Sequence, residues 1–166
     1  MGLRLALIAD THMPRGGRRL DPECVQALRA ADAIVHAGDF HAEETLEWFE
    51  ALGPPLRAVH GNVDVAAVRA RLPEVAEFEA GGVRFGLIHD SGPARGRLER
   101  MRARFPDADA VIFGHSHMPR HEEADGFQIF NPGSPTERRR APRRSFGIAR
   151  IERGAVEFKH VWLSDG

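Results

Sequence analysis

The stretch "VIFGHSHMPR", Val111 to Arg120, decides the fold. A run of apolar residues ends at Gly114, and two histidines follow with one residue between them. An unbroken apolar run is typical of a strand that is covered on both faces. Polar ligands bind where such strands end, so the stretch predicts a buried strand that delivers His115 and His117 to a binding site.

Four other segments share this pattern, an apolar run that ends in Gly, Asp, Asn or His. They are "LRLALIAD" (3–10), "DAIVHAGD" (32–39), "PLRAVHGN" (55–62) and "VRFGLIHD" (83–90), and the opening stretch extends back to "DAVIFGH" (109–115). Together these segments predict five strands that are buried on both faces.

Apolar residues at helical spacing lie between these strands and predict four amphipathic helices. Their stripes are Val25, Leu28 and Ala31; Leu46, Phe49 and Leu52; Val65, Val68 and Leu72; and Leu98, Met101 and Phe105. Asp21 and Pro22 are an N-cap and first-turn pair for the first helix. The pairs Gly81-Gly82, Asp125-Gly126 and Arg153-Gly154 predict tight turns between strands. We therefore expect an α/β fold with mixed sheets packed between helices, parallel in the first half and antiparallel towards the C-terminus.

Length and composition place the chain among globular proteins. At 166 residues, 42% hydrophobic and 28% charged, we expect one soluble domain, residues 1–166, and no membrane span. The lone cysteine, Cys24, fits a small core residue of a cytoplasmic protein. The net charge of −1 argues against a general nucleic-acid binder. The basic run Arg138 to Arg144 is the exception; a solvated loop is the favoured interpretation, and a clamp for phosphate is the alternative.

Seven polar side chains of metal-ligand type follow the predicted strands. They are Asp10, His12, Asp39, Asn62, His89, His115 and His117. The carboxyl ends of parallel strands meet at one rim of an open α/β sheet, so we expect these side chains to converge. Each one alone has an ordinary explanation, such as a hydrogen-bonded histidine or a helix cap. The ordered set "DTH", "GD", "GN", "IHD" and "GHSH" within one short chain is far more specific.

This order of motifs resembles the calcineurin-like metallophosphoesterase superfamily, and within it the small phosphodiesterases of the YfcE type. The resemblance covers nearly the whole chain, and "NPGSP" (131–135) is similar to the segment that follows the last metal motif in that group. The resemblance implies an αββα sandwich of two mixed β-sheets flanked by helices, with two divalent metal ions bound.

The resemblance also implies a role for each motif. The first metal would be bound by Asp10, His12 and His117, the second by Asn62, His89 and His115, and Asp39 would bridge the two. We assign Asp39, Asn62 and His115 to catalysis as well. Nitrogen and oxygen ligands without thiolate suit manganese, iron, zinc or nickel, and we favour manganese.

Charge supports a phosphate ester as the substrate. Two divalent cations bring four positive charges, and the carboxylates of Asp10 and Asp39 return only two negative ones. The surplus attracts an anion and lowers the pKa of a bridging water, so hydroxide can attack phosphorus in line with the leaving group. The expected activity is hydrolysis of phosphodiester bonds, and also of phosphomonoesters.

One departure from the family pattern concerns the leaving group. Many superfamily members have "GNH" where this chain has "GNV", so Val63 replaces a histidine that can protonate the leaving oxygen. His41 is a candidate substitute acid, and a solvent-facing residue is the alternative. Asp64 and Asp90 are expected either to be hydrogen-bond partners that support the ligand residues, as carboxylates that orient ligand histidines often are, or to cap helices. Arg15, Arg18 and Arg19, which follow the first motif, are better placed to meet a phosphate than the later arginine run.

Two other function classes compete with a phosphoesterase. A retromer subunit in the superfamily keeps this fold and binds protein partners, but its ligand pattern is eroded, whereas every ligand position is filled here. A nuclease would be expected to show a broad basic stripe, which this chain lacks. We expect a small phosphate ester as the ligand, neither a membrane nor a nucleic acid as a partner, and we leave a homo-oligomer open.

Overall fold

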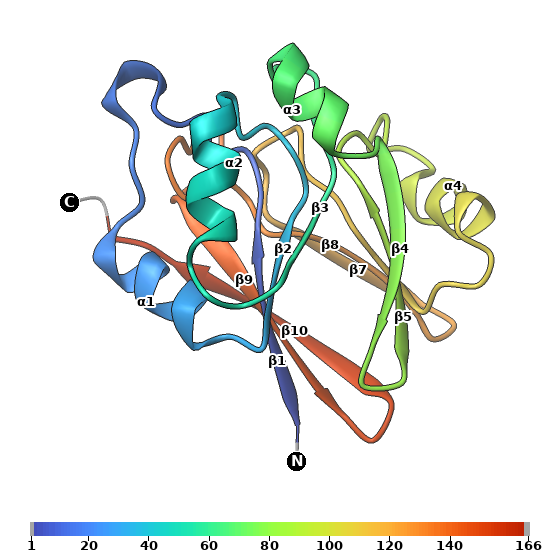
Figure 1. Ribbon diagram of the computed structural model, residues 1–166. Helices are drawn as coiled ribbons and strands as arrows, with labels where there is room; N and C mark the ends of the chain where they lie inside the picture. The colour runs from blue at the N-terminus through green and yellow to red at the C-terminus, as the bar shows by residue number, and fades with distance from the viewer. Residues whose placement is uncertain (1, 165–166) are drawn as a thin grey trace.

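The protein is described by a computed structural model over residues 2–164 (Figure 1). Its strands form two five-stranded sheets in the middle of the molecule, and the helices lie outside them. Within residues 2–164, no helix has the length and apolar character needed to cross a membrane.

The first sheet has the strand order β10-β9-β1-β2-β3. Its strands are β1 (Leu3–Ile8), β2 (Ala33–His36), β3 (Leu56–Ala58), β9 (Ser145–Glu152) and β10 (Ala155–Trp162). β1, β2 and β3 are parallel, whereas β9 is antiparallel to both of its neighbours. Ile8 lies opposite His36, so β1 and β2 end at the same edge of the sheet.

The second sheet has the order β4-β5-β6-β8-β7. Its strands are β4 (Val75–Ala80), β5 (Val83–Ile88), β6 (Ala110–Ile112), β7 (Arg120–Ala124) and β8 (Phe127–Asn131). The three inner strands are parallel, and the edge strands β4 and β7 pair antiparallel to them. The expected parallel-then-antiparallel division is therefore incomplete, because the β7–β8 hairpin returns β8 to the direction of β6.

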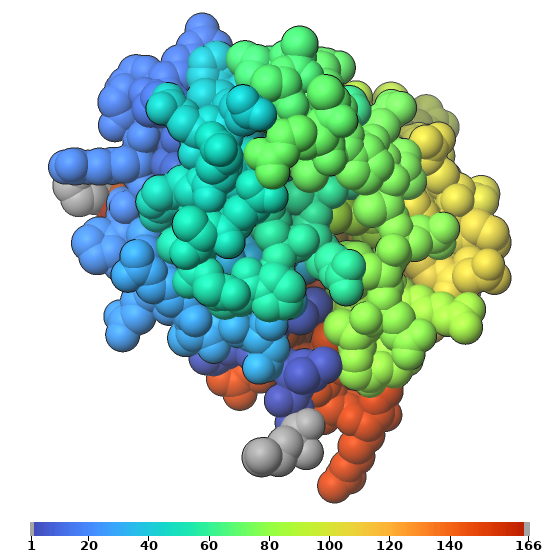
Figure 2. Space-filling model, viewed as in Figure 1, coloured from blue at the N-terminus to red at the C-terminus, as the bar shows by residue number. Residues whose placement is uncertain are grey.

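Four α-helices cover the outer faces of the sheets (Figure 1). They are α1 (Pro22–Ala30), α2 (Glu43–Glu50), α3 (Ala66–Arg71) and α4 (Arg97–Arg104), and a short 3-10 helix, η1 (Arg15–Gly17), precedes α1. Figure 2 shows the loop after β1, α2 and α3 next to one another along one edge of the molecule. Thr45 of α2 donates a hydrogen bond to the carbonyl of Met13, which ties this loop to the helix.

Three apolar clusters define the layers. One joins the outer face of the first sheet to α1, α2 and α3 through residues such as Ile34, Leu28 and Phe49. A second lies between the sheets, where Leu7 and Val35 of the first share a core with Phe85 and Ile112 of the second. A third packs α4 on the second sheet. The expected αββα sandwich of two mixed sheets and the three hairpin turns are confirmed. The five predicted strands are present, but burial on both faces is wrong for β3, an edge strand in which Arg57 is exposed.

The start of α1 differs in one detail from the prediction. Asp21 is the N-cap residue and Pro22 opens the helix, but the Asp21 side chain makes no capping hydrogen bond. Its carboxylate instead forms an ion pair with Arg144, at 3.0 Å. A guanidinium brought in by β9 provides a charged partner, which is a stronger one than a backbone amide. Arg144 is thus a structural residue rather than part of a solvated run.

Candidate metal centre

The strands of both sheets end at one rim, and all seven predicted ligand side chains lie there. Backbone hydrogen bonds join the loops that carry them: Asp10 N donates to the carbonyl of Gly38, and Gly114 N donates to the carbonyl of His89. The second of these bonds crosses from β5 to β6. The rim is therefore a connected set of loops, which holds the side chains in fixed relation to one another.

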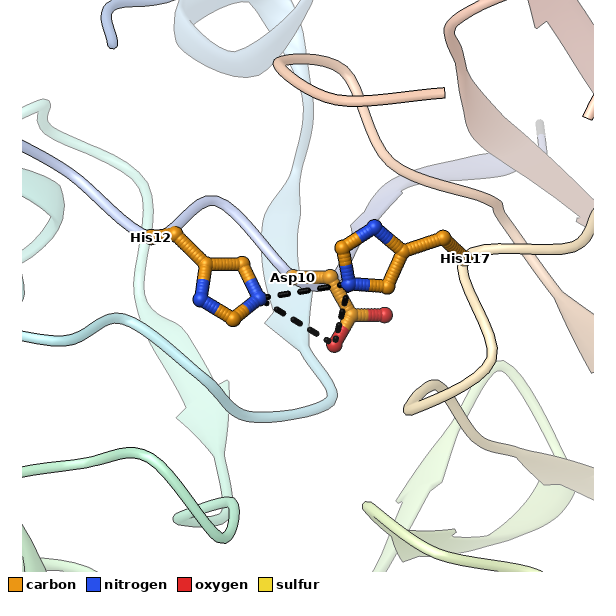
Figure 3. A group of neighbouring side chains, drawn as sticks. All are labelled: Asp10, His12 and His117. Atoms are coloured by element: carbon orange, nitrogen blue, oxygen red, sulfur yellow. Dashed lines mark hydrogen bonds and ion pairs between the residues drawn. The ribbon is translucent and has the colours of Figure 1, made fainter. Parts of the chain in front are cut away.

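The first group of side chains consists of Asp10, His12 and His117 (Figure 3). The Nε2 atoms of the two histidines are 3.3 Å apart, and Asp10 Oδ1 lies 3.9 Å from the first and 3.8 Å from the second. His117 Nδ1 donates to the carbonyl of Glu137 at 3.0 Å, so in the neutral ring the Nε2 lone pair faces the group. All three side chains are buried, and their lone pairs converge as metal ligands do.

The second group centres on His89 Nε2. This atom lies 3.1 Å from Asp39 Oδ2, 3.0 Å from Asn62 Oδ1 and 3.3 Å from His115 Nδ1. His89 Nδ1 donates to the carbonyl of Ala37 at 2.8 Å, so this ring also turns its second nitrogen to the pocket. One carboxylate, one amide and two imidazoles thus point at one small volume.

The two groups are contiguous through their carboxylates. Asp39 Oδ2 of the second group is 3.8 Å from His12 Nε2 of the first, and Asp10 Oδ1 is 3.9 Å from His89 Nε2. Asp10 Oδ1 is fully buried and has no hydrogen-bond partner within residues 2–164. A buried, unpaired carboxylate oxygen is costly unless a cation binds it. The donor set and this unpaired atom therefore fit divalent metal ions.

The backbone at the rim adopts an unfavourable conformation. Five of the seven residues have positive φ: Asp10 (56°), His12 (47°), Asp39 (65°), His115 (76°) and His117 (62°). Each non-glycine residue in this region costs on the order of 1 kcal/mol, and such residues cluster at functional sites. Glycine would relieve the strain but would supply no ligand atom. The folding energy of the sandwich thus keeps these five side chains aimed at one pocket.

Two glycines make room for the ligand side chains. A Cβ on Gly61 would lie 2.0 Å from Asp39 Oδ1, and one on Gly114 would lie 3.1 Å from Asp10 Oδ2. Neither contact leaves space for a methyl group without movement of a carboxylate. Glycine is therefore required at Gly61 by close packing against the pocket.

Burial and charge together perturb the pKa values in the pocket. Burial raises the pKa of Asp10 to about 7 and lowers that of His117 to about 4. Burial also opposes a charge on His89, but the hydrogen bond to Asp39 and the charges of both carboxylates raise its pKa to about 9. The Asp39 carboxylate is desolvated too, yet its contacts with His89 lower its pKa. Negative charge in the pocket thus depends on a positive partner, a role that a cation can fill.

The predicted supporting residues play different parts. Asp64 accepts hydrogen bonds from the backbone N–H groups of Asp39 (3.0 Å), Gly61 (2.7 Å) and His41 (2.7 Å). Asp64 thus supports the loop that carries the candidate ligand Asp39, as expected of a partner of the ligand residues, but it contacts backbone N–H groups and no histidine ring. It does not cap α3, which begins after Val65 without a side-chain cap. Asp90 Oδ2 lies 3.9 Å from His115 Nε2, on the side of the ring away from the pocket.

His41 lies at the edge of the site. Its φ is 92°, it pairs with Met13 in a β-bridge, and its buried Nδ1 has no hydrogen-bond partner within residues 2–164. Within the described residues, this nitrogen makes no hydrogen bond that would prevent it from donating a proton to a ligand. Its role as the acid remains a prediction.

Sequence reasoning missed part of the wall of the site. Ser134, in the "NPGSP" segment, donates to the carbonyl of Asp10 at 2.8 Å. The carbonyl of Glu137 fixes the ring of His117. A backbone carbonyl has no signature in the sequence, so only the "NPGSP" motif pointed to this segment.

The fold and the site define a class, an αββα sandwich whose strand ends form a metal-binding pocket. A family model described as the calcineurin-like phosphoesterase superfamily domain matches residues 3–154. The chain therefore belongs to the calcineurin-like phosphoesterase superfamily, as the order of its motifs indicated.

Relatives with assigned names support the same class. The chain is 34% identical over 138 residues to a probable metallophosphoesterase of Methanothermobacter thermautotrophicus, covering 80% of this chain and 77% of the relative. It is 25% identical over 144 residues to a phosphodiesterase of Methanocaldococcus jannaschii, covering 79% of this chain and 83% of the relative. The relatives indicate a phosphoesterase in general terms.

Solved structures show the same fold over nearly the whole chain. A Thermotoga maritima protein has a TM-score of 0.77 at 27% identity and covers 97% of this chain and 99% of its own. Vacuolar protein sorting 29 of Cryptosporidium parvum has a TM-score of 0.77 at 21% identity, with 99% of each chain covered. Zn²⁺-complexed Vps29 of Entamoeba histolytica has a TM-score of 0.75 at 23% identity, covering 96% and 99%. At these identities the Vps29 structures share the fold alone.

Proposed function

We propose that the protein is a dinuclear metal-dependent phosphoesterase that hydrolyses phosphodiester bonds and also phosphomonoesters. The observation that carries the proposal is the pair of buried carboxylates, Asp10 and Asp39, each within 3.9 Å of imidazole nitrogens from both groups. Two divalent cations held there would polarise a phosphoryl oxygen and lower the pKa of a water. No covalent intermediate on the protein is required.

Each of the seven candidate ligands would have a defined role. Asp10, His12 and His117 would hold one cation, and Asn62, His89 and His115 the other, with Asp39 shared between them. Asp39, Asn62 and His115 would also position the reacting phosphate and the attacking water. Asn62 is a neutral and weak donor, so the second cation is the one expected to be lost more readily.

Metal addition tests the proposal directly. Protein stripped with a chelator should not hydrolyse bis(p-nitrophenyl) phosphate or p-nitrophenyl phosphate, and adding back Mn²⁺ should restore the highest activity among Mn²⁺, Fe²⁺, Zn²⁺ and Ni²⁺. The assay measures release of p-nitrophenolate, with bound metal counted by elemental analysis. Full activity of metal-free protein would overturn the proposal.

Leaving-group dependence tests the effect of Val63. Its side chain cannot donate a proton, and general-acid help is worth about 10²- to 10⁴-fold. We expect aryl phosphate esters to be cleaved far faster than alkyl esters, with kcat/KM falling steeply as the leaving-group pKa rises. His41→Gln should steepen the slope if His41 is the acid. A wild-type rate that is flat across leaving groups would show that a proton donor acts after all.

A protein-binding scaffold is the second candidate function, because the Vps29 structures share the fold. Chaetomium thermophilum Vps29 is known in complex with a cyclic peptide. A complete set of seven candidate ligands favours the enzyme. Absence of turnover with every metal, in protein shown to bind two ions, would favour the scaffold. A nuclease would instead show affinity for DNA or RNA that falls strongly with salt.

We further propose that residues 1–166 form a single domain with a cytoplasmic location and a small phosphate ester as its ligand. Neither a membrane nor a nucleic acid is part of this proposal, and formation of a homo-oligomer is left open.

A further inference from the structure

The segment after the last predicted metal motif is fastened to the metal centre at several points. Thr136 Oγ1 donates to the carbonyl of Thr11 at 2.9 Å, between the candidate ligands Asp10 and His12. The carbonyl of Glu137 accepts from His117 Nδ1 at 3.0 Å. The basic run therefore begins at the wall of the pocket, not on a remote loop.

The side chain of Glu137 lies between two guanidinium groups. Arg18 Nη2 is 3.2 Å from Glu137 Oε2, and Arg139 Nε is 3.9 Å from Glu137 Oε1. The Arg139 side chain is 50% exposed, and its contact with the carboxylate is too long for a hydrogen bond. Two positive charges thus share one negative charge at the pocket wall, and Arg139 is the more loosely held.

The charge of Arg139 reaches into the metal centre. Burial is the largest cause of the shifted pKa values of His12 and His117, and Arg139 lowers both further. At Asp10, where burial raises the pKa, the same guanidinium acts in the opposite direction. The geometry agrees: Glu137 contacts His117 through its carbonyl and Arg139 through its carboxylate, so the guanidinium lies beside the rim of the metal centre.

The backbone of Arg139 is also unusual. Nine non-glycine residues within 2–164 have positive φ. Five are the candidate ligands described above, His41 lies beside them, and Asp125 and Arg153 occupy the tight hairpin turns. The remaining one is Arg139, with φ of 48°. A turn closed by the hydrogen bond from Ala141 N to the carbonyl of Arg138, at 2.8 Å, holds Arg139 in this conformation and fixes its backbone two residues after Glu137.

We propose that Arg139 binds the phosphate group of the substrate and favours phosphates with two negative charges over those with one. This inference rests on the proposed phosphoesterase function and deepens it by naming the substrate class. A guanidinium presents paired N–H donors that match phosphate oxygens. In the free protein Glu137 partly neutralises Arg139, and a bound phosphate displaces this contact. Because Coulomb energy scales with charge, the effect on a dianion is about twice that on a monoanion on a logarithmic scale.

A charge series at the pocket wall tests this inference. The variants are Arg139→Gln, Glu137→Gln and, as a matched control, Arg140→Gln, an exposed neighbour in the same run. Metal-loaded full-length protein is assayed at pH 8 and low salt on bis(p-nitrophenyl) phosphate, a monoanion, and p-nitrophenyl phosphate, which is a dianion there. Thermal melting checks that each variant is folded.

The expected changes have opposite signs. Arg139→Gln should lower kcat/KM about 3-fold for the diester and about 10-fold for the monoester, mostly through KM. Glu137→Gln should raise kcat/KM, again more for the monoester, and Arg140→Gln should change neither substrate by more than about 2-fold. Added salt should shrink these differences, since the groups are partly exposed.

Two results would overturn the inference. One is an equal effect of Arg139→Gln on both substrates, or none; the other is a loss of activity in Glu137→Gln, which would show that the ion pair is merely structural. Inorganic phosphate binding, measured by calorimetry, separates this inference from the proposed function. If the wild type lacks turnover but binds phosphate, weaker binding by Arg139→Gln and tighter binding by Glu137→Gln still support the inference, and unchanged binding refutes it.

Discussion

Asp39→Asn is expected to abolish hydrolysis of bis(p-nitrophenyl) phosphate, a loss of about 10³-fold or more in kcat. Its Oδ2 lies 3.1 Å from His89 Nε2 and 3.8 Å from His12 Nε2, so it is the carboxylate oxygen best placed to serve both groups. An amide keeps the shape of the side chain but removes the negative charge that two cations need. His117→Ala should have a similar effect, because it removes a ligand from the first group.

The matched control is Asp107→Asn, the same chemical change at an exposed position. Its activity and melting temperature should equal those of the wild type. Elemental analysis should find less than two equivalents of metal in Asp39→Asn, while circular dichroism shows the wild-type fold. Retention of two tightly bound ions together with normal turnover would refute the shared role of Asp39.

Gly61→Ala is expected to reduce kcat by about 10²-fold or more, although it adds a single methyl group at a residue with no reactive atoms. The methyl carbon would lie 2.0 Å from Asp39 Oδ1 and 2.7 Å from its backbone nitrogen, so the carboxylate must move. The backbone at Gly61 does not have positive φ, so alanine itself is tolerated there. Titration with Mn²⁺ should show weaker metal binding.

Gly86→Ala provides the control for general destabilisation. Its methyl carbon would lie 2.6 Å from the ring of Phe105, in the core that packs α4 on the second sheet. Overpacking of this kind costs about 1–3 kcal/mol in the free energy of unfolding. We expect Gly86→Ala to melt at a lower temperature and to keep normal kcat, whereas Gly61→Ala should lose activity. Equal losses of activity would mean that Gly61 matters only for stability.

The residues at the strand ends were predictable because the sequence signals that mark them lie next to one another in the chain. A buried strand shows as an apolar run, and the polar residue directly after it, such as Asp39 or His89, is visible in the same stretch. The helices and hairpin turns also have local signals, such as the apolar spacing before Gly53 and the pair Asp125-Gly126. These elements and the αββα class were correctly predicted.

The side-chain contacts that the sequence did not indicate depend on partners distant in sequence. Asp21 is the N-cap residue of α1 as predicted, but its carboxylate pairs with the guanidinium of Arg144, 3.0 Å away, instead of with a backbone amide. Asp64 was expected to support the ligand residues or to cap a helix, and the structure shows which groups it contacts: three backbone N–H groups from two loops, one of them that of Asp39. The arginine run was expected to be solvated, and Arg138, Arg139, Arg140 and Arg143 are exposed, whereas Arg144 pairs with Asp21. A carboxylate or guanidinium binds whichever donor the fold brings near, and its own neighbours in sequence do not reveal that donor.

The order of apolar runs and the polar residues that end them indicated, without coordinates, an α/β fold with mixed sheets and the seven candidate ligands, and the resemblance of the motifs to a known family implied the sandwich class. Burial of apolar side chains drives the strands together, and the apolar or polar character of each residue can be read directly from the sequence. The same resemblance implied how the seven divide into two groups, and only the tertiary structure decided which ring nitrogens face the pocket. That outcome depends on distances of 3 to 4 Å between atoms of residues far apart in sequence, such as the imidazoles of His12 and His117 and the carboxylate of Asp10. The energy of such contacts depends on the distance between the two side chains in the folded protein, and the packing of the strands determines that distance.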